Sequence, residues 1–436
     1  MKRKIMTDLI EWKNSKERKP LILRGARRVG KTYILKEFGE KYYKNIAYFN
    51  FESNKSLYNI FENNKDLDKI VEQLFLVNGT EIEKENTLII FDEIQECLDA
   101  FFVLQYFSKE TGYHIVGACS FYPLRISKIT FDIGKIIFFV DFLNLYPMTF
   151  SEFLEADGCE NLVEFMKSIH KIEAIPKIFE NKLVEKLKIY FLVGGMPEAV
   201  YSWVNEKDFK RVNDIQQSIL DSYSKNFFRN IDVYEAKKIS LIWEETPMRL
   251  AKEKKSFVYQ NTDYASVIKE ESAIDWLSDA HLIYKLTNII NADFPFTKYS
   301  SLLNLELGDF KIYLNDIGLL CKMFNLDSNI NNNMLFEGFN GAFVENYVCQ
   351  TFSFNPGLNY FTFDHNEIDF VFEDKNGEII PIEGKSNKSI NKDSLIKYSN
   401  KYNFHKCLRF SLDNLKKDGA IINVPLYLIE YIENIL

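Results

Sequence analysis

The order of apolar and polar positions divides the chain into segments of different character. From Pro20 to Gly134, short apolar runs alternate with longer stretches of helical spacing, a pattern typical of an open parallel α/β sheet. The runs have the length of buried strands and are Leu21–Leu23, Ile46–Phe51, Leu88–Phe91 and His114–Gly117. We therefore expect residues 1–149 to form an α/β domain with a parallel sheet.

Helical spacing replaces these runs over the next segment. Apolar residues follow the 3.6-residue period through Phe153–Leu154, Leu162–Val163 and Leu183–Phe191, which predicts a helical domain over 150–233. From Tyr234 onward, short helices lead to the apolar run Leu282–Leu286, which is typical of a winged helix-turn-helix over 234–325.

A second, smaller α/β domain is expected at the C-terminal end of the sequence, over 334–436. Asn occupies five of nine positions in Asn325–Asn333, which predicts a linker before it. The domain is predicted from the helices Phe339–Phe352 and Asp393–Tyr402, the strand pair Ile368–Glu373 and Glu378–Glu383, and terminal strands.

Composition excludes several classes of protein. The chain of 436 residues is 46% hydrophobic and 27% charged, so it can bury large cores and is neither disordered nor collagenous. Its apolar runs are shorter than the roughly 18 residues of a membrane helix, and its start lacks the apolar region of a signal peptide. We expect a cytoplasmic protein without a membrane partner. The six Cys form no Cys-x-x-Cys pair, so neither disulfides nor structural zinc are expected.

Charge is distributed unevenly along the chain. The formal net charge is -8, yet residues 1–28 contain ten Lys or Arg and three acids. This basic start has two interpretations, a surface for nucleic acid or the solvated face of a helix. We favour the solvated face.

The strongest chemical motif is the segment Gly25-Ala26-Arg27-Arg28-Val29-Gly30-Lys31-Thr32, which fits G-x-x-x-x-G-K-[ST] without a gap. It directly follows an apolar run and precedes a helix-forming stretch, as a phosphate-binding loop requires. The two glycines let the backbone N–H groups turn toward phosphate oxygens. Lys31 is expected to reach the β and γ phosphates, and Thr32 to bind Mg²⁺.

Some sixty residues after this loop, the apolar run Leu88–Phe91 ends in two carboxylates. In Leu88-Ile89-Ile90-Phe91-Asp92-Glu93 we assign Asp92 to the Mg²⁺ shell and Glu93 to the activation of water. Ser120, at the end of the next run, is expected to face the γ-phosphate. The chain contains no Asn-Lys-x-Asp, the usual reader of guanine, so ATP is the expected nucleotide.

These motifs together resemble a prokaryotic AAA-type ATPase family, similar to archaeal ATPases and STAND-type NTPases, whose members carry a C-terminal domain of unknown function related to PD-(D/E)XK nucleases. The resemblance rests on Gly25–Thr32, Leu88–Glu93, Leu145–Phe153, Gly194–Glu198, Phe310–Leu320 and Leu408–Leu412. It implies a P-loop core with a helical lid, a winged helix and a small α/β restriction-endonuclease-like domain.

The resemblance also implies roles for single residues. Pro197 would pack on the adenine, although it could equally be a core proline after a helix-capping Gly-Gly. The sequence Cys119–Pro123 departs from the small, Gly-flanked sensor loop of the family, which puts the rate of hydrolysis in doubt more than ATP binding. Arg125, Arg229 and Arg249 are all eligible as an arginine finger.

The predicted winged helix lacks the charge of a DNA reader. Its longest helix, Tyr264–Ala280, has one Lys and four acids, a net charge of -3 that a phosphate backbone would repel. We therefore expect it to act as an intramolecular scaffold.

A second group of carboxylates lies in the C-terminal strand pair. Successive side chains of a strand point to opposite faces, so Glu383 and Lys385 lie on the same face of their strand. A three-residue hairpin loop with Gly377 in the left-handed conformation would pair Asp369 with Glu383, whereas a two-residue Asn376-Gly377 turn would put the two carboxylates on opposite faces. We prefer the three-residue loop.

In the preferred register, Asp369 and Glu383 could hold a divalent metal while Lys385 orients water toward a phosphodiester. Glu345 matches the additional metal-facing Glu that some nucleases of this fold carry. Five Lys and one acid within residues 385–401 could follow a phosphate backbone, or could simply keep a helix soluble.

The sequence thus predicts an ATP-binding protein, a Mg²⁺-dependent ATPase whose nucleotide state positions a C-terminal nuclease-like domain. Nucleic acid would be the partner of that domain if its site is active. The alternative is an ATP-gated interaction or regulatory switch with an inactive nuclease-like module. Helicase activity is a weaker third hypothesis, and a homo-oligomer is compatible with the family resemblance.

Overall fold

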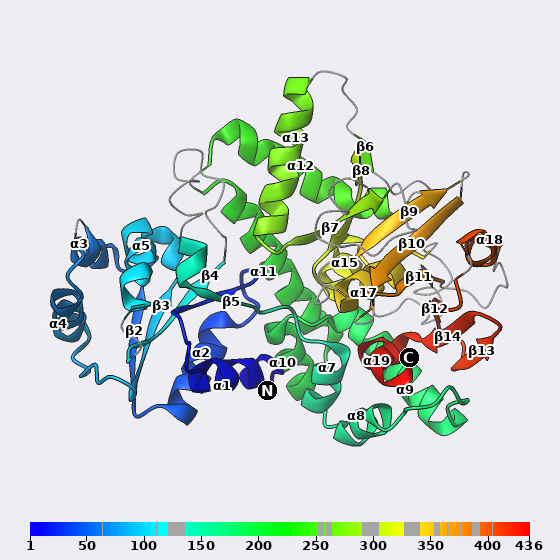
Figure 1. Ribbon diagram of the computed structural model, residues 1–436, viewed down its shortest axis with the longest axis horizontal. Helices are drawn as coiled ribbons and strands as arrows, with labels where there is room; N and C mark the ends of the chain where they lie inside the picture. The colour runs from blue at the N-terminus through cyan, green and yellow to red at the C-terminus, as the bar shows by residue number, and fades with distance from the viewer. Residues whose placement is uncertain are drawn as a thin grey trace. The chain divides into compact units, whose positions relative to one another are not determined.

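The computed structural model describes residues 1–62, 64–109, 112–120, 136–229, 231–251, 257–258, 264–289, 305–326, 341–352, 358–363, 366–374, 377–385, 393–402 and 404–436 (Figure 1). The chain forms two compact units. The first, called the N-terminal unit, is Met1–Tyr146 with Asp279–His281, and the second, called the C-terminal unit, is Pro147–Ser278 with Leu282–Leu436.

A parallel sheet forms the centre of the N-terminal unit, so the predicted α/β class is confirmed. Its strand order is β2-β3-β4-β1-β5, and every pairing in it is parallel. The strands are β1 (Leu21–Arg24), β2 (Asn45–Asn50), β3 (Thr87–Asp92), β4 (His114–Cys119) and β5 (Asp141–Asn144). The first four coincide with the predicted runs. The sequence prediction missed β5, because its four residues are half-buried and lack an apolar run.

The connections between these strands are helical. They include α2 (Lys31–Tyr42), α3 (Tyr58–Phe61), α4 (Leu67–Asn78) and α5 (Leu98–Phe107), and α1 (Ile5–Asn14) precedes the sheet. In α1 the buried side chains are Ile5, Leu9 and Trp12, which follow the helical period. The core formed by β2, β3 and β4 with the helices α3 to α5 is rich in aromatic pairs, such as Phe51 with Phe91 at 5.5 Å. The sheet carries the motif residues at the carboxyl ends of its strands.

Helices occupy the described part of 150–251 in the C-terminal unit. They are α7 (Phe150–Ala156), α8 (Glu160–Lys167), α9 (Lys177–Val193), α10 (Pro197–Glu206), α11 (Phe209–Phe227) and α12 (Val233–Leu250). Thr149 begins α7 with a capping box, in which its side chain accepts from the Glu152 N–H and Glu152 bonds back to the Thr149 N–H. The helix α13 (Tyr264–Asp279) follows.

A mixed sheet forms the other half of this unit, with the strand order β13-β14-β12-β11-β10-β9-β7-β8-β6. Its strands are β6 (Phe257–Val258), β7 (Ile283–Ile289), β8 (Leu305–Leu314), β9 (Asn359–Phe363), β10 (Asn366–Glu373), β11 (Ile379–Gly384), β12 (Cys407–Ser411), β13 (Lys416–Asp418) and β14 (Ile421–Pro425). The helices α15 (Ile317–Met323), α17 (Ala342–Phe352), α18 (Asp393–Tyr402) and α19 (Ile432–Ile435) accompany it.

The sheet joins two segments that the sequence separates. Strand β7 pairs in parallel with β9, with Asn288 opposite Tyr360. The strands predicted as the wing of a winged helix therefore belong to the same sheet as the strands of 334–436. Apolar periodicity identifies strands but not their partners, which explains the difference. The domain limits at 325 and 334 stay a prediction, and most of the predicted linker, residues 327–333, lies outside the described residues.

The hairpin of β10 and β11 has the predicted three-residue register. Phe370 lies opposite Ile382 and Glu373 opposite Ile379, so the same register places Asp369 opposite Glu383. The Asp374 N–H donates to the Glu378 carbonyl, and Gly377 has a left-handed φ of 78°. The alternative two-residue turn is excluded. Lys375 and Asn376 themselves lie outside the described residues.

Within the described part of the chain, none of the helices is both long and apolar enough to cross a membrane.

Candidate functional site

The segment Gly25–Thr32 connects β1 to α2 as a tight loop. Gly30 precedes the helix with a left-handed φ of 99°, where a residue with a Cβ would be strained. A Cβ on Gly25 would lie 2.2 Å from the Leu145 carbonyl oxygen. Both glycines are thus required by the backbone path, as the motif predicts.

Lys31 is buried at the first position of α2, with 5% of its surface exposed. Its Nζ donates to the carbonyl oxygens of Gly25 at 2.8 Å and Ala26 at 3.0 Å. Burial lowers the pKa of Lys31, while the charges of Glu93 and Asp92 raise it. The loop therefore holds an ammonium group at its centre, close to two carboxylates.

The remaining side chains of the loop lie in different surroundings. Ala26 and Val29 are buried, and Arg28 has a left-handed φ of 66°. Arg27 Nη2 donates to both carboxylate oxygens of Glu52, at 2.8 and 2.9 Å. This ion pair attaches the loop to the segment after β2.

Asp92, at the end of β3, is the meeting point of three elements. Its Oδ2 accepts hydrogen bonds from Thr32 Oγ1 at 2.9 Å, Tyr48 OH at 2.6 Å and Asn50 Nδ2 at 3.2 Å. Its Oδ1 is buried and has no hydrogen-bond partner in the structure. Tyr48 and Asn50 were not predicted from the sequence. They reach Asp92 because β2 pairs in parallel with β3, which puts Asn50 beside Asp92.

Glu93 and Ser120, which follow the neighbouring strands β3 and β4, lie in contact. Ser120 Oγ donates to Glu93 Oε1 at 2.9 Å, and Gln95 Nε2 donates to Glu93 Oε2 at 2.5 Å. Glu93 has a left-handed φ of 51°, which is uncommon for a residue other than Gly, Asn or Asp. The neighbouring sensor residues 121–123 and Arg125 lie outside the described residues.

The donor set around Asp92 fits Mg²⁺, a cation that prefers oxygen ligands and keeps several waters. The Thr32 hydroxyl and the Asp92 carboxyl lie within hydrogen-bond distance of each other. A buried carboxylate oxygen without a hydrogen-bond partner is costly unless a cation or a water approaches it. The unpartnered Oδ1 of Asp92 is such an atom.

The turn Gly194–Pro197 lies in the C-terminal unit. A Cβ on Gly195 would lie 2.1 Å from the Met148 carbonyl oxygen, and the Gly195 N–H donates to Asp316 Oδ2 at 2.6 Å. The pKa of Asp316 is raised to about 6, because burial outweighs the lowering effect of the backbone N–H groups bonded to it. Pro197 is the first residue of α10, a position that Pro favours in any helix. Its packing on adenine stays a prediction.

Two of the three candidate arginine fingers are described. Arg249, in the last turn of α12, forms an ion pair with Glu245 at 2.9 Å. Arg229 follows α11, and its backbone N–H donates to the Asn226 carbonyl. Neither observation selects a finger.

The C-terminal carboxylates form a buried group in the sheet. Asp369 is 8% exposed and Glu383 is 2% exposed. Asp369 Oδ2 accepts from the Gly384 N–H at 2.9 Å, and Lys385 Nζ lies 3.5 Å from Glu383 Oε1. Glu383 Oε2 is buried without a hydrogen-bond partner in the structure. The pKa of Glu383 is raised to about 7, chiefly by burial; the charge of Asp369 also raises it, whereas Lys385 and Arg409 lower it.

Strand β8 adds two side chains that sequence analysis missed. Tyr313 OH donates to Glu345 Oε2 at 3.2 Å. Lys311 is fully buried and forms an ion pair with Glu367. Burial lowers the pKa of Lys311, but Glu367, Glu345 and Asp369 raise it, with a net upward shift. A lysine inside the otherwise apolar run Phe310–Leu314 was the available signal.

Two lysine side chains thus lie among these carboxylates. Across the described residues, no three His, Cys, Asp or Glu side chains are grouped in a way that could hold a metal ion. Lys311 and Lys385 both interact with the charges of Glu345 and Asp369. The metal roles of Glu345, Asp369 and Glu383 stay predictions, and Lys388 and Lys392 lie outside the described residues.

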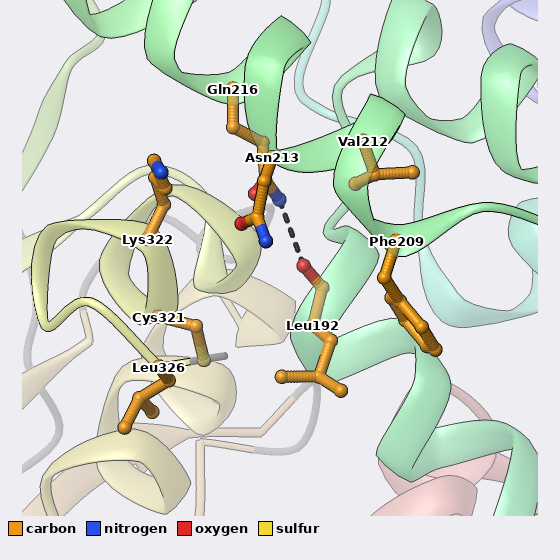
Figure 2. A pocket seen from close by; sticks show the side chains of 8 residues that line it. All are labelled: Leu192, Phe209, Val212, Asn213, Gln216, Cys321, Lys322 and Leu326. Atoms are coloured by element: carbon orange, nitrogen blue, oxygen red, sulfur yellow. Dashed lines mark hydrogen bonds between the residues drawn. The ribbon is translucent and has the colours of Figure 1, made fainter. Parts of the chain in front are cut away.

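A small pocket lies elsewhere in the C-terminal unit, between α9, α11 and α15 (Figure 2). At its edge, Gln216 Nε2 donates to the carbonyl oxygens of Leu192 at 2.8 Å and Val193 at 3.0 Å. Its volume of about 10 Å³ accommodates about one water molecule. It is too small for a nucleotide.

Comparison with known families divides the chain into three matched segments. Residues 17–154 match the model of an AAA domain. Residues 184–330 and 340–429 match two domains of unknown function, DUF8612 and DUF4143. The first match supports an AAA-type, ATP-binding domain. The third names no activity, so the relation of the C-terminal domain to nucleases stays a prediction.

Similarity to individual proteins is distant. The chain is 24% identical over 431 residues to an uncharacterized protein of Methanocaldococcus jannaschii, covering 95% of this chain and 83% of that protein. Among solved structures, the Aeropyrum pernix ORC2 protein is 13% identical, with a TM-score of 0.33 over 73% of this chain and 90% of that one. Domain III of the Thermotoga maritima replication initiation protein DnaA is 15% identical, with a TM-score of 0.27 over 49% of this chain and 90% of that one.

Proposed function

We propose that the chain binds ATP with Mg²⁺ on the loop Gly25–Thr32 and hydrolyses it with Glu93 as the general base. The observation that carries this proposal is the environment of Asp92. One of its carboxylate oxygens accepts from Thr32, and the other is buried without a hydrogen-bond partner. A carboxyl group oriented in this way is suited to the coordination shell of a cation held by Thr32.

Each motif residue has a distinct part in this proposal. The Lys31 ammonium would exchange the carbonyls of Gly25 and Ala26 for phosphate oxygens, which are stronger acceptors because they are charged. Mg²⁺, when bound, would neutralise charge on the phosphates. Glu93, held by Ser120 and Gln95, would accept the proton of the attacking water.

The test is phosphate release by the full chain. With ATP and Mg²⁺ we expect release above background, which excess EDTA stops, and a preference for ATP over GTP. Equal release with and without a divalent cation would contradict the proposed site.

A second candidate function concerns the C-terminal domain. We propose that Asp369, Glu383 and Lys385 perform metal-dependent phosphodiester chemistry, controlled by the nucleotide state of the AAA domain. The register that places Asp369 opposite Glu383 and the unpartnered Oε2 of Glu383 favour it. Lys311 and Lys385 favour the alternative, because they balance much of the carboxylate charge. In that alternative the module is inactive and ATP gates an interaction.

An assay of DNA and RNA cleavage distinguishes the active site from the inactive module. The substrates are incubated with the full chain and Mg²⁺ or Mn²⁺, with and without ATP. A working site requires cleavage that is lost in Asp369→Ala, Glu383→Ala and Lys385→Ala. Cleavage that all three variants retain would exclude this site as its origin.

A further inference from the structure

Helix α12 carries a line of exposed side chains at regular spacing. Tyr234, Leu241 and Met248 follow each other at intervals of seven residues and are 60%, 57% and 63% exposed. Lys237 and Glu244, also exposed, lie between them on the same face. We call these five residues the outer stripe of α12. The opposite face is buried through Ala236, Ile239, Trp243 and Leu250.

The spacing of the outer stripe is that of a helix-pairing seam. Its side chains lie alternately three and four residues apart, as along the contact line of two paired helices, with apolar residues at every seventh position and a charged residue between them. Single exposed apolar residues are normal on a protein surface. Three in one line, on a helix whose other face already supplies the packing of the unit, are what a second helix would cover.

We propose that the outer stripe pairs with the outer stripe of a second copy of the chain, with the helices antiparallel and a two-fold axis passing beside Leu241. A rise of 1.5 Å per residue puts Tyr234 and Met248 about 10.5 Å on either side of Leu241. In the antiparallel pair, Leu241 therefore meets its own copy. Tyr234 meets Met248 of the second copy, so the stripe is complementary to itself.

Charge selects this orientation over the parallel one. Lys237 lies about 6 Å before Leu241 and Glu244 about 4.5 Å after it. The antiparallel pair therefore brings Lys237 of each copy close to Glu244 of the other. A parallel pair in register would oppose Lys237 to Lys237 and Glu244 to Glu244, which is repulsive.

The charged residues beside Lys237 and Glu244 on α12 form ion pairs with one another. Lys238 forms an ion pair with Glu235 at 3.7 Å, and Arg249 with Glu245 at 2.9 Å. In the described part of the chain, Lys237 and Glu244 take part in no ion pair, and Glu244 accepts a hydrogen bond from Ser240 at 3.0 Å. The proposed pairing would give each of them a partner of opposite charge.

Disulfide crosslinking of the full chain tests the geometry. The Leu241→Cys variant should form a covalent dimer on mild oxidation, because the two thiols lie beside the axis. Tyr234→Cys should not crosslink with itself, since its two copies would lie about 21 Å apart. A mixture of Tyr234→Cys with Met248→Cys should give the mixed dimer. The unmodified chain is the blank, because five of its six Cys are buried and Cys159 is half-buried.

Charge reversal provides the matched control. In sedimentation equilibrium, Lys237→Glu and Glu244→Lys should each weaken self-association at least tenfold. An equimolar mixture of the two variants, and the double variant, should both recover it. The result that overturns the proposal is a monomeric chain at 100 μM, or self-crosslinking of Tyr234→Cys without that of Leu241→Cys. Nucleotide is absent throughout, so failure of the ATPase proposal would not alter these outcomes.

Discussion

The Thr32 hydroxyl donates a 2.9 Å hydrogen bond to Asp92 Oδ2, and this bond joins two motifs that lie 60 residues apart in the sequence. Tyr48 and Asn50 donate to the same oxygen from the neighbouring strand. Three donors therefore orient the carboxyl group, and the other oxygen remains buried without a partner. If this site binds a cation as proposed, its carboxyl group would already be oriented, so reorganisation would contribute little to the free energy of binding.

Replacing Glu93 with Gln should slow hydrolysis without removing ATP binding. Gln keeps the size of the side chain and can still bond to Ser120 and Gln95, but it cannot accept a proton. Loss of a general base typically costs 10² to 10⁴ in rate, so we expect phosphate release to fall by roughly 10² or more. Asp92→Asn is the comparison variant and should weaken the Mg²⁺-dependent part of ATP binding. Interchanged phenotypes would show that the base and metal roles are assigned wrongly.

A divalent cation should stabilise the C-terminal unit if Asp369 and Glu383 hold one. A ligand that binds only the folded state stabilises it by about 2.7 kcal/mol when its free concentration is 100 times the dissociation constant. This stabilisation raises the melting temperature. We expect Mn²⁺ to raise the melting temperature of the full chain by a few degrees. Asp369→Ala and Glu383→Ala should each abolish that rise. Glu378→Ala, at an exposed position of the same hairpin, is the control and should leave it unchanged. A melting temperature that does not respond to Mn²⁺ would remove the basis of this site.

The stability of the C-terminal unit should depend on the protonation of Glu383. Its pKa is raised from 4.5 to about 7 in the folded state, chiefly by burial. A raised pKa means that the folded state favours the protonated form. The resulting stabilisation is present below pH 4.5 and is lost as pH rises through about 7.

Glu383→Gln should remove this dependence. Gln stays neutral, so its advantage over Glu in the free energy of unfolding should grow between pH 5 and pH 8. The expected growth is on the order of 2 kcal/mol. Urea unfolding of both proteins across this range measures the difference. An advantage that is constant with pH would refute the assignment.

Gly195→Ala should destabilise the C-terminal unit. The added Cβ would lie 2.1 Å from the Met148 carbonyl oxygen and 2.8 Å from the Met148 nitrogen, both of them backbone atoms. Relieving this overlap requires backbone shifts that typically cost 1 to 3 kcal/mol, so we expect a loss of about 2 kcal/mol in urea unfolding. At Gly158 a Cβ would meet open space. Gly158→Ala should therefore lose only about 1 kcal/mol, because its backbone is left-handed. Equal losses of stability in Gly195→Ala and Gly158→Ala would argue against the overlap.

The parts of the fold that depend on local sequence could be predicted. The apolar runs before Gly25 and Asp92 identify their strands, and the loop motif predicts a candidate site at the strand ends, because its residues are contiguous. The hairpin of Asp369 and Glu383 was predictable for the same reason, since loop length determines its register.

Residues that reach a site across the sheet could not be predicted. Tyr48 and Asn50 contact Asp92 only because β2 pairs with β3, and apolar periodicity does not reveal which strands pair. Lys311 and Tyr313 reach the C-terminal carboxylates because β8 belongs to the same sheet as β10 and β11. In the sequence they lie in a segment predicted to be a separate winged helix.

The most direct test of the proposed function is calorimetric titration of the full chain with a slowly hydrolysed ATP analogue and Mg²⁺, compared with Lys31→Ala. Lys31 supplies the ammonium group at the centre of the loop, and without it the backbone N–H groups compete poorly with water for the phosphates. We expect saturable binding by the unmodified chain and by Lys41→Ala, whose side chain is exposed on the same helix, and no measurable binding by a folded Lys31→Ala variant. Equal affinity of the unmodified chain and the Lys31→Ala variant would contradict the account.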